Sequence, residues 1–121
     1  MSNMTTVTKG DIIELKALHN PPALVKTVLE ATVLLLGYTP AEAKYWKFVR
    51  GLLNDPTFLN KVNNLQAENC TPESAKLAKD LLQDVTEEKA CKVSMAVSKL
   101  ATLAKKTVDD CESAGKLKDP S

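Results

Sequence analysis

Prolines at helix starts constrain this chain more than any other feature of its 121-residue sequence. Three of them follow a residue that can cap a helix, in the pairs Thr39-Pro40, Asp55-Pro56 and Thr71-Pro72. Proline is tolerated in the first turn of a helix, and a Thr or Asp before it can accept a hydrogen bond from an unpaired backbone N–H. A fourth break, Asn20-Pro21-Pro22, ends one helix and starts the next. The sequence therefore predicts a series of short helices.

Apolar residues between these breaks recur at helical spacing, and no segment alternates with period two for long enough to be a strand. Gly37 is a natural stop for the second helix. The expected helices cover about residues 11–18, 22–36, 40–53, 56–65, 72–85 and 86–114. The predicted fold class is all-α, one compact bundle of about six helices joined by short loops.

The composition agrees with a single folded domain and argues against some classes of binding partner. Hydrophobic residues make up 44% of the chain, which is enough for one core. Sixteen Lys and Arg against 15 Asp and Glu give a formal net charge of +1, and aromatics are 4%, so we expect no nucleic-acid binding. The longest strongly apolar run, Val33 to Leu36, is too short to span a membrane, so we expect a soluble, intracellular protein.

Catalytic and metal-binding patterns are sparse. The chain has three cysteines, one histidine (His19) and no CxxC motif, which predicts neither a metal site nor a disulfide framework. Two pairs of neighbouring carboxylates, Glu87/Glu88 and Asp109/Asp110, point about 100° apart on a helix and cannot converge on one substrate. We therefore expect no enzymatic activity and no cofactor, and look for function in a surface.

Specific motifs resemble the microtubule-binding domain of dynein heavy chains. The run from His19 to Ala31, closing on Leu34–Gly37, is similar to the family's opening motif, NPP-x-x-VK…LLG, where the stalk enters the globular tip. Weaker matches follow in the right order: Trp46-Lys47-x-Val49-Arg50, Asp55-Pro56-x-Phe58-Leu59, Val93-Ser94-Met95-Ala96 and Pro120. The resemblance spans about residues 19–120.

The resemblance implies a division of the chain. Residues 1–20 would be the end of the outgoing coiled-coil strand of the stalk, and residues 21–121 the globular microtubule-binding domain, ending at the start of the returning strand. Asn20, Pro21 and Pro22 would form the hinge between them. The family's ATPase ring lies elsewhere in the parent chain, so this piece would be non-catalytic. Leu103 and Asp110 replace aromatics common in the family, and this divergence implies an axonemal heavy chain, in the cytoskeleton of a cilium or flagellum.

The resemblance also supplies candidate contacts with α/β-tubulin. The family docks through its first, third and sixth helices, and matching positions here are Lys26, Thr27 and Glu30; Asn60 and Lys61; and Lys105, Lys106, Lys116 and Lys118. Tubulin is strongly acidic, so a few lysines on one edge could steer and align binding despite the low net charge. Sliding of the stalk strands would set the affinity, with Glu14 as an alternative partner for Lys26.

An alternative interpretation is a helical docking domain for another protein. Some outer-arm dyneins carry a leucine-rich-repeat light chain on this domain. The docking surface would then lie near Lys92, Ser94 and Lys99.

Overall fold

The computed structural model describes residues 7–17, 23–65 and 71–113. These residues form eight α-helices and no strand, so the predicted all-α class is confirmed. The helices are α1 (Lys9–Lys16), α2 (Ala23–Leu35), α3 (Pro40–Lys44), α4 (Trp46–Leu53), α5 (Phe58–Asn63), α6 (Pro72–Leu82), α7 (Glu87–Val93) and α8 (Met95–Ser113).

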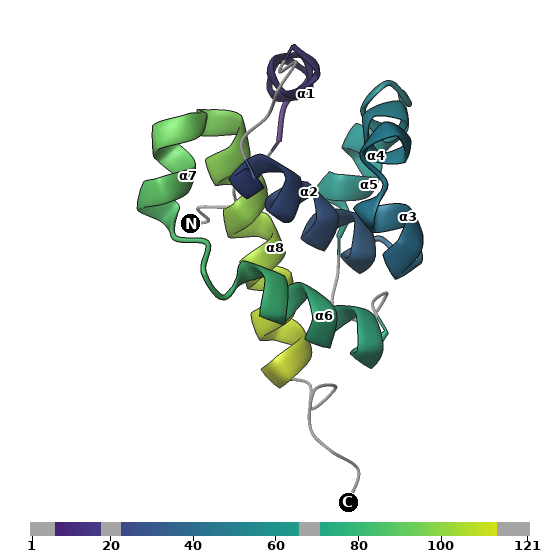
Figure 1. Ribbon diagram of the computed structural model, residues 1–121, viewed down its shortest axis with the longest axis vertical. Coiled ribbons are helices and arrows are strands. Elements are labelled where there is room, and N and C mark those ends of the chain that lie inside the picture. Colours follow the sequence, from purple (N-terminus) through teal and green to yellow (C-terminus); the bar gives the residue numbers. More distant parts are fainter. Residues whose placement is uncertain (1–6, 18–22, 66–70, 114–121) are drawn as a thin grey trace, which may run out of the picture.

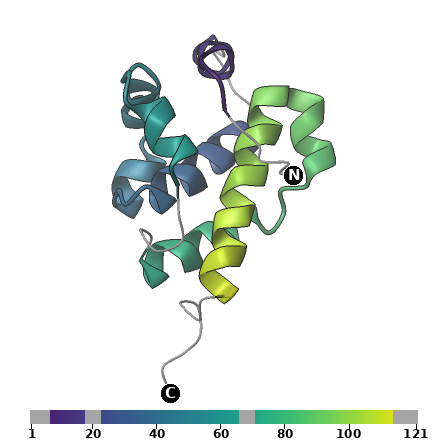
Figure 2. The same cartoon turned by 180° about the vertical axis from the view of Figure 1, so that it is seen from behind.

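Helix α2 is the centre of the bundle. It packs against α6 and the long α8, while α7 folds back along the start of α8. Helices α3, α4 and α5 lie on the opposite side of α2 from α7, and α1 lies across one end, against α8 and α4 (Figure 1). The view from behind shows α8 running the length of the molecule (Figure 2). The central position of α2 explains why it is apolar over most of its surface.

The core consists of large aliphatic side chains from most of the helices, together with one fully buried aromatic ring. Fully buried members with the greatest volume include Leu15, Leu29, Leu34, Leu35, Phe58 and Leu100. Small residues line the contact between α6 and α8, where Ala75, Ala78 and Ala104 have no exposed surface. Because these side chains are small, the two helices can approach each other closely.

Most of the predicted helix ends are confirmed. Thr39 forms a full capping box with Glu42, and the Thr71 hydroxyl accepts a bond from the Ser74 N–H. Helix α2 ends in a turn at Gly37, where the Gly37 N–H donates to the Leu34 carbonyl and the Tyr38 N–H to the Val33 carbonyl. Gly37 has φ +105°, a conformation that favours glycine.

Two expected helices are each broken in two, so eight helices replace the predicted six among the described residues. The helix expected over 40–53 breaks at Tyr45, which is extended at φ −85° and ψ 103°. The helix expected from residue 86 onward breaks at Ser94, at φ −172° and ψ 142°. The Ser94 hydroxyl accepts a bond from the Ala96 N–H, so this side chain caps α8.

The predicted start at Asp55-Pro56 is wrong in detail. The Asp55 carboxylate accepts bonds from the Thr57 N–H at 2.9 Å and the Thr57 hydroxyl at 2.8 Å. This side chain therefore closes a turn of its own, and α5 begins only at Phe58.

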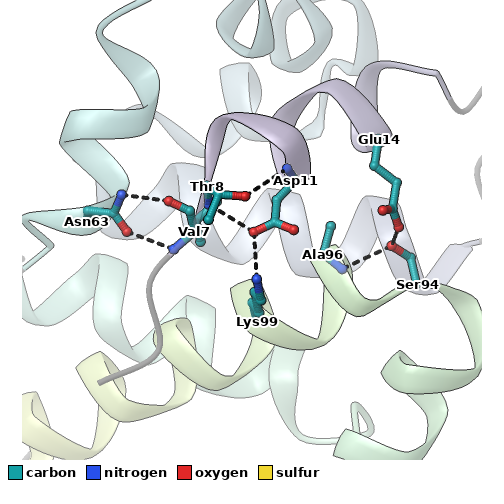
Figure 3. A network of polar contacts seen from close by, with 8 residues as sticks. All are labelled: Val7, Thr8, Asp11, Glu14, Asn63, Ser94, Ala96 and Lys99. Carbon is teal, nitrogen blue, oxygen red and sulfur yellow. Dashed lines mark hydrogen bonds and ion pairs between the residues drawn. The ribbon is translucent and has the colours of Figure 1, made fainter. Parts of the chain in front are cut away.

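Helix α1 is fastened to the bundle by polar contacts (Figure 3). The Asn63 side chain of α5 both accepts from the Val7 N–H at 2.9 Å and donates to the Val7 carbonyl at 2.8 Å. The Asp11 carboxylate lies 3.0 Å from the Lys99 ammonium of α8. The Ser94 hydroxyl donates to Glu14. Each contact joins positions more than fifty residues apart, so α1 is held by tertiary structure.

Several sequence expectations lie outside the described residues. The hinge residues Asn20, Pro21 and Pro22 are among them, as are His19, Lys116, Lys118 and Pro120. The division into a stalk end and a globular tip stays a prediction. Within the described ranges, none of the helices combines the length and apolar character needed to cross a membrane.

Candidate functional site

Lys26 projects from the exposed side of the first turns of α2. Its ammonium lies 5.7 Å from the centroid of the Trp46 ring. Trp46 is half-buried and is the first residue of α4, immediately after the break at Tyr45. An ammonium over an aromatic face is attracted by the ring quadrupole. Glu30 lies four residues further along α2, and these two described residues form no ion pair.

Lys61 has a similar environment on α5. Its ammonium lies 5.9 Å from the centroid of the Tyr38 ring and 3.4 Å from the Tyr38 hydroxyl. Tyr38 in turn packs edge-on against Phe48 of α4, with ring centroids 5.4 Å apart. The turn at Gly37 therefore places the Tyr38 hydroxyl beside a lysine of another helix. The neighbouring candidate Asn60 is exposed, and its carbonyl accepts a bond from the Asn64 side chain.

The remaining candidates on α2, Thr27 and Glu30, are half-buried. Burial raises the pKa of the Glu30 carboxyl above its ordinary value, and the positive charge of Lys44 partly offsets this effect. Glu30 is thus less exposed than Lys26 and less available to an external partner.

The α8 candidates belong to another part of the surface. Lys105 is half-buried, and its ammonium donates to the Val85 carbonyl in the α6–α7 connection. Lys106 is exposed in the middle of the same helix, and α8 continues through both residues without a break. Figures 1 and 2 place helix α5, which carries Lys61, and the α6–α7 connection that Lys105 contacts on opposite sides of α2.

Sequence reasoning missed the aromatic partners of the two lysines and the network that holds α1. Trp46 was part of a recognised motif, but nothing in the sequence joined it to Lys26. In this structure Glu14 accepts from Ser94, and its pairing with Lys26 in a weak-affinity state stays a prediction. Ser94 and Lys99, two residues of the alternative docking surface, are both engaged in holding α1.

Asp11 is a charged residue in a buried position, with only 8% of its surface exposed. Burial by itself would raise the pKa of this carboxyl. Hydrogen bonds from the Thr8 N–H and the Lys99 ammonium outweigh that effect and lower the pKa below its ordinary value. Within the described parts of the chain, no three His, Cys, Asp or Glu side chains group together as metal ligands would.

Three relatives show what the chain is similar to. Human dynein axonemal heavy chain 6 is 39% identical over 90 residues, which cover 73% of this chain. The cytoplasmic dynein heavy chain of Drosophila melanogaster is 32% identical over 95 residues, or 75% of this chain. Human dynein axonemal heavy chain 10 is 31% identical over 83 residues, or 66% of this chain. This chain is homologous to a segment of dynein heavy chains.

The dynein relatives are far longer than this sequence. The chain spans about 2% of the length of each of these three proteins. Both axonemal and cytoplasmic heavy chains are among them, so the similarity places the chain in a cytoskeletal motor family without separating these two classes. No protein-family profile matches the chain.

Proposed function

We propose that this chain is the microtubule-binding tip of a dynein heavy chain, docking weakly and reversibly between α- and β-tubulin. The observation that carries the proposal is the environment of Lys26. This lysine belongs to the motif that resembles the entry to the dynein tip, and it stands exposed on α2 with its ammonium over Trp46. Homology to dynein heavy chains supports the same interpretation.

The chemistry of the exposed lysines suits an acidic filament. Lys26 and Lys61 come from α2 and α5, two of the helices that the resemblance assigns to the contact. Exposed ion pairs contribute only about 0.2–1 kcal/mol each, so a few of them fall well short of the roughly 8 kcal/mol that a micromolar affinity requires, and we expect binding to be weak. Such contacts weaken as salt is added. Weak binding suits a motor that releases its track in every cycle.

Helix α1 provides the path by which the stalk would set that affinity. If α1 is the end of the outgoing strand, its bonds to α5 and α8 connect the stalk to the helix that carries Asn60 and Lys61. Sliding of the strand would then act on α5 as well as on the hinge into α2. The parent motor hydrolyses ATP elsewhere, and the fragment itself has no catalytic role in this proposal. Its location would be the cytoskeleton, in an axoneme if the heavy chain is axonemal.

Co-sedimentation with microtubules across ionic strength tests the proposal. We expect the fragment to pellet at low salt and to lose affinity steadily as salt rises. Lys26→Glu should weaken binding at least tenfold with helical content unchanged. A fragment that stays in the supernatant at low salt, in every register of cross-linked stalk strands, contradicts the proposal.

A groove offers a second candidate function, docking of a dynein light chain. It has a volume of about 660 Å³ between α2, α6 and α7. Its walls include the apolar Leu24, Leu81, Val85 and Val93 and the charged Asp80, Asp84, Lys89 and Lys92. Binding of a leucine-rich-repeat light chain that survives high salt, and is lost in Leu81→Asp, would favour this candidate.

A further inference from the structure

Two aromatic rings lie behind two of the lysines proposed to contact tubulin. Within residues 7–17, 23–65 and 71–113, Lys26 lies over the Trp46 ring, and Lys61 lies at the hydroxyl end of the Tyr38 ring. In each pair the ring comes from a different element than the lysine, so tertiary structure creates the contact.

The rings are themselves fixed. Trp46 is half-buried against the core at the first position of α4. Tyr38 follows the turn at Gly37 and packs edge-on against Phe48. A ring held in this way offers a stationary π-face, whereas a free lysine side chain samples many rotamers.

We propose that Trp46 and Tyr38 are positioning residues, which hold the ammonium groups of Lys26 and Lys61 in place for an acidic partner. This inference rests on the proposed function, because it specifies how the same site binds. A side chain ordered before association loses less entropy on binding. Both lysines are exposed, so a carboxylate can reach each ammonium.

The placement of the ammonium groups can be tested without microtubules. Protons next to an aromatic face are shielded, so the side-chain ε-CH₂ signals of Lys26 should lie upfield of those of exposed lysines such as Lys76 in NMR spectra. Trp46→Leu should return the Lys26 signals to the ordinary position and leave those of Lys61 unchanged. Tyr38→Phe, which removes the hydroxyl that Lys61 contacts, should move the Lys61 signals and leave those of Lys26 unchanged. Unshifted Lys26 signals in the wild-type protein would overturn the inference.

A double-mutant cycle tests the effect on binding. We expect Trp46→Leu to weaken microtubule binding about threefold to tenfold, and Trp46→Phe, which keeps a ring, to restore most of it. In a Lys26→Gln background, Trp46→Leu should cost nothing further, because the lysine it positions is gone. The same loss in both backgrounds would show that Trp46 acts only through structure, and would overturn the inference.

The two hypotheses fail in different ways. If the wild-type protein does not bind microtubules but the Lys26 signals are shifted, the proposed function is wrong while Trp46 still positions Lys26. If binding is salt-sensitive but the signals are unshifted, the proposed function stands and the positioning role is wrong. Circular dichroism of each variant separates either result from unfolding.

Discussion

Position 37 favours glycine because of its backbone conformation, and not because a side chain would lack space. Its φ is +105°, yet a Cβ built at this position meets no atom within 4 Å. Gly37→Ala should therefore destabilise the fold by about 1 kcal/mol through backbone strain alone. Gly51→Ala is the matched control, because Gly51 lies inside α4 with equally open space. It should stabilise by about 0.5–1 kcal/mol, since alanine is the better helix former. Urea denaturation measures both, and equal signs would contradict this explanation.

The charge of Asp11 makes the stability of the folded protein depend on pH. Its pKa is lowered in the folded state, because the Thr8 N–H and the Lys99 ammonium outweigh the effect of burial. Its contribution is therefore complete above the ordinary pKa of about 4, and is lost as the pH falls through the lower folded value. Asp11→Asn should cost about 1–3 kcal/mol at pH 7, and this difference should shrink toward pH 2.

Denaturation across pH 2 to 7 tests the role of Asp11 against a second aspartate. The pKa of Asp55 is also lowered, by the N–H and hydroxyl of Thr57, but this carboxylate only closes a local turn. Asp55→Asn is thus the control for a general acid effect. A constant difference between wild type and Asp11→Asn at every pH would contradict the assignment to the Asp11 charge.

Helix α1 depends on its neighbours, because eight residues are too few for a stable isolated helix. Asn63 holds the chain just before it through two bonds to Val7. Asn63→Ala should therefore speed amide hydrogen exchange in residues 7–17 well above its effect on α2 or α6. Asn64→Ala is the control, since the Asn64 side chain bonds only within its own turn, to the Asn60 carbonyl. Equal protection of α1 in both variants would show that Asn63 does not hold it.

Local signals in the sequence were sufficient for most helix ends. Thr39, Thr71 and Thr86 cap the helices that follow them, and Gly37 ends α2, because each acts on backbone groups within a few residues. The break at Ser94 could not be predicted in this way. Its hydroxyl is fixed partly by Glu14, which is eighty residues away, so the reason for the break exists only in the folded chain.

The candidate site shows the same limit. Motif similarity selected Lys26 and Lys61, but their rings come from other elements, and no sequence spacing links position 26 to 46 or 61 to 38. Aromatic side chains are only 4% of the chain, which argued against stacking surfaces in general. Here three of the five rings, Tyr38, Trp46 and Phe48, lie just after α2 or in the first turn of α4, and each contacts a lysine or another ring.

The molecule as a whole has almost no net charge, so its attraction to an acidic filament must depend on where its lysines lie. Lys26→Glu and Lys76→Glu each change the formal net charge from +1 to −1, because a cation is replaced by an anion. Lys26 lies over Trp46, whereas Lys76 is exposed on α6, outside the proposed contact. If local geometry governs binding, Lys26→Glu should weaken microtubule co-sedimentation at least tenfold and Lys76→Glu less than about twofold. Equal losses in the two variants would show that overall charge, and not the surface around α2, determines the affinity.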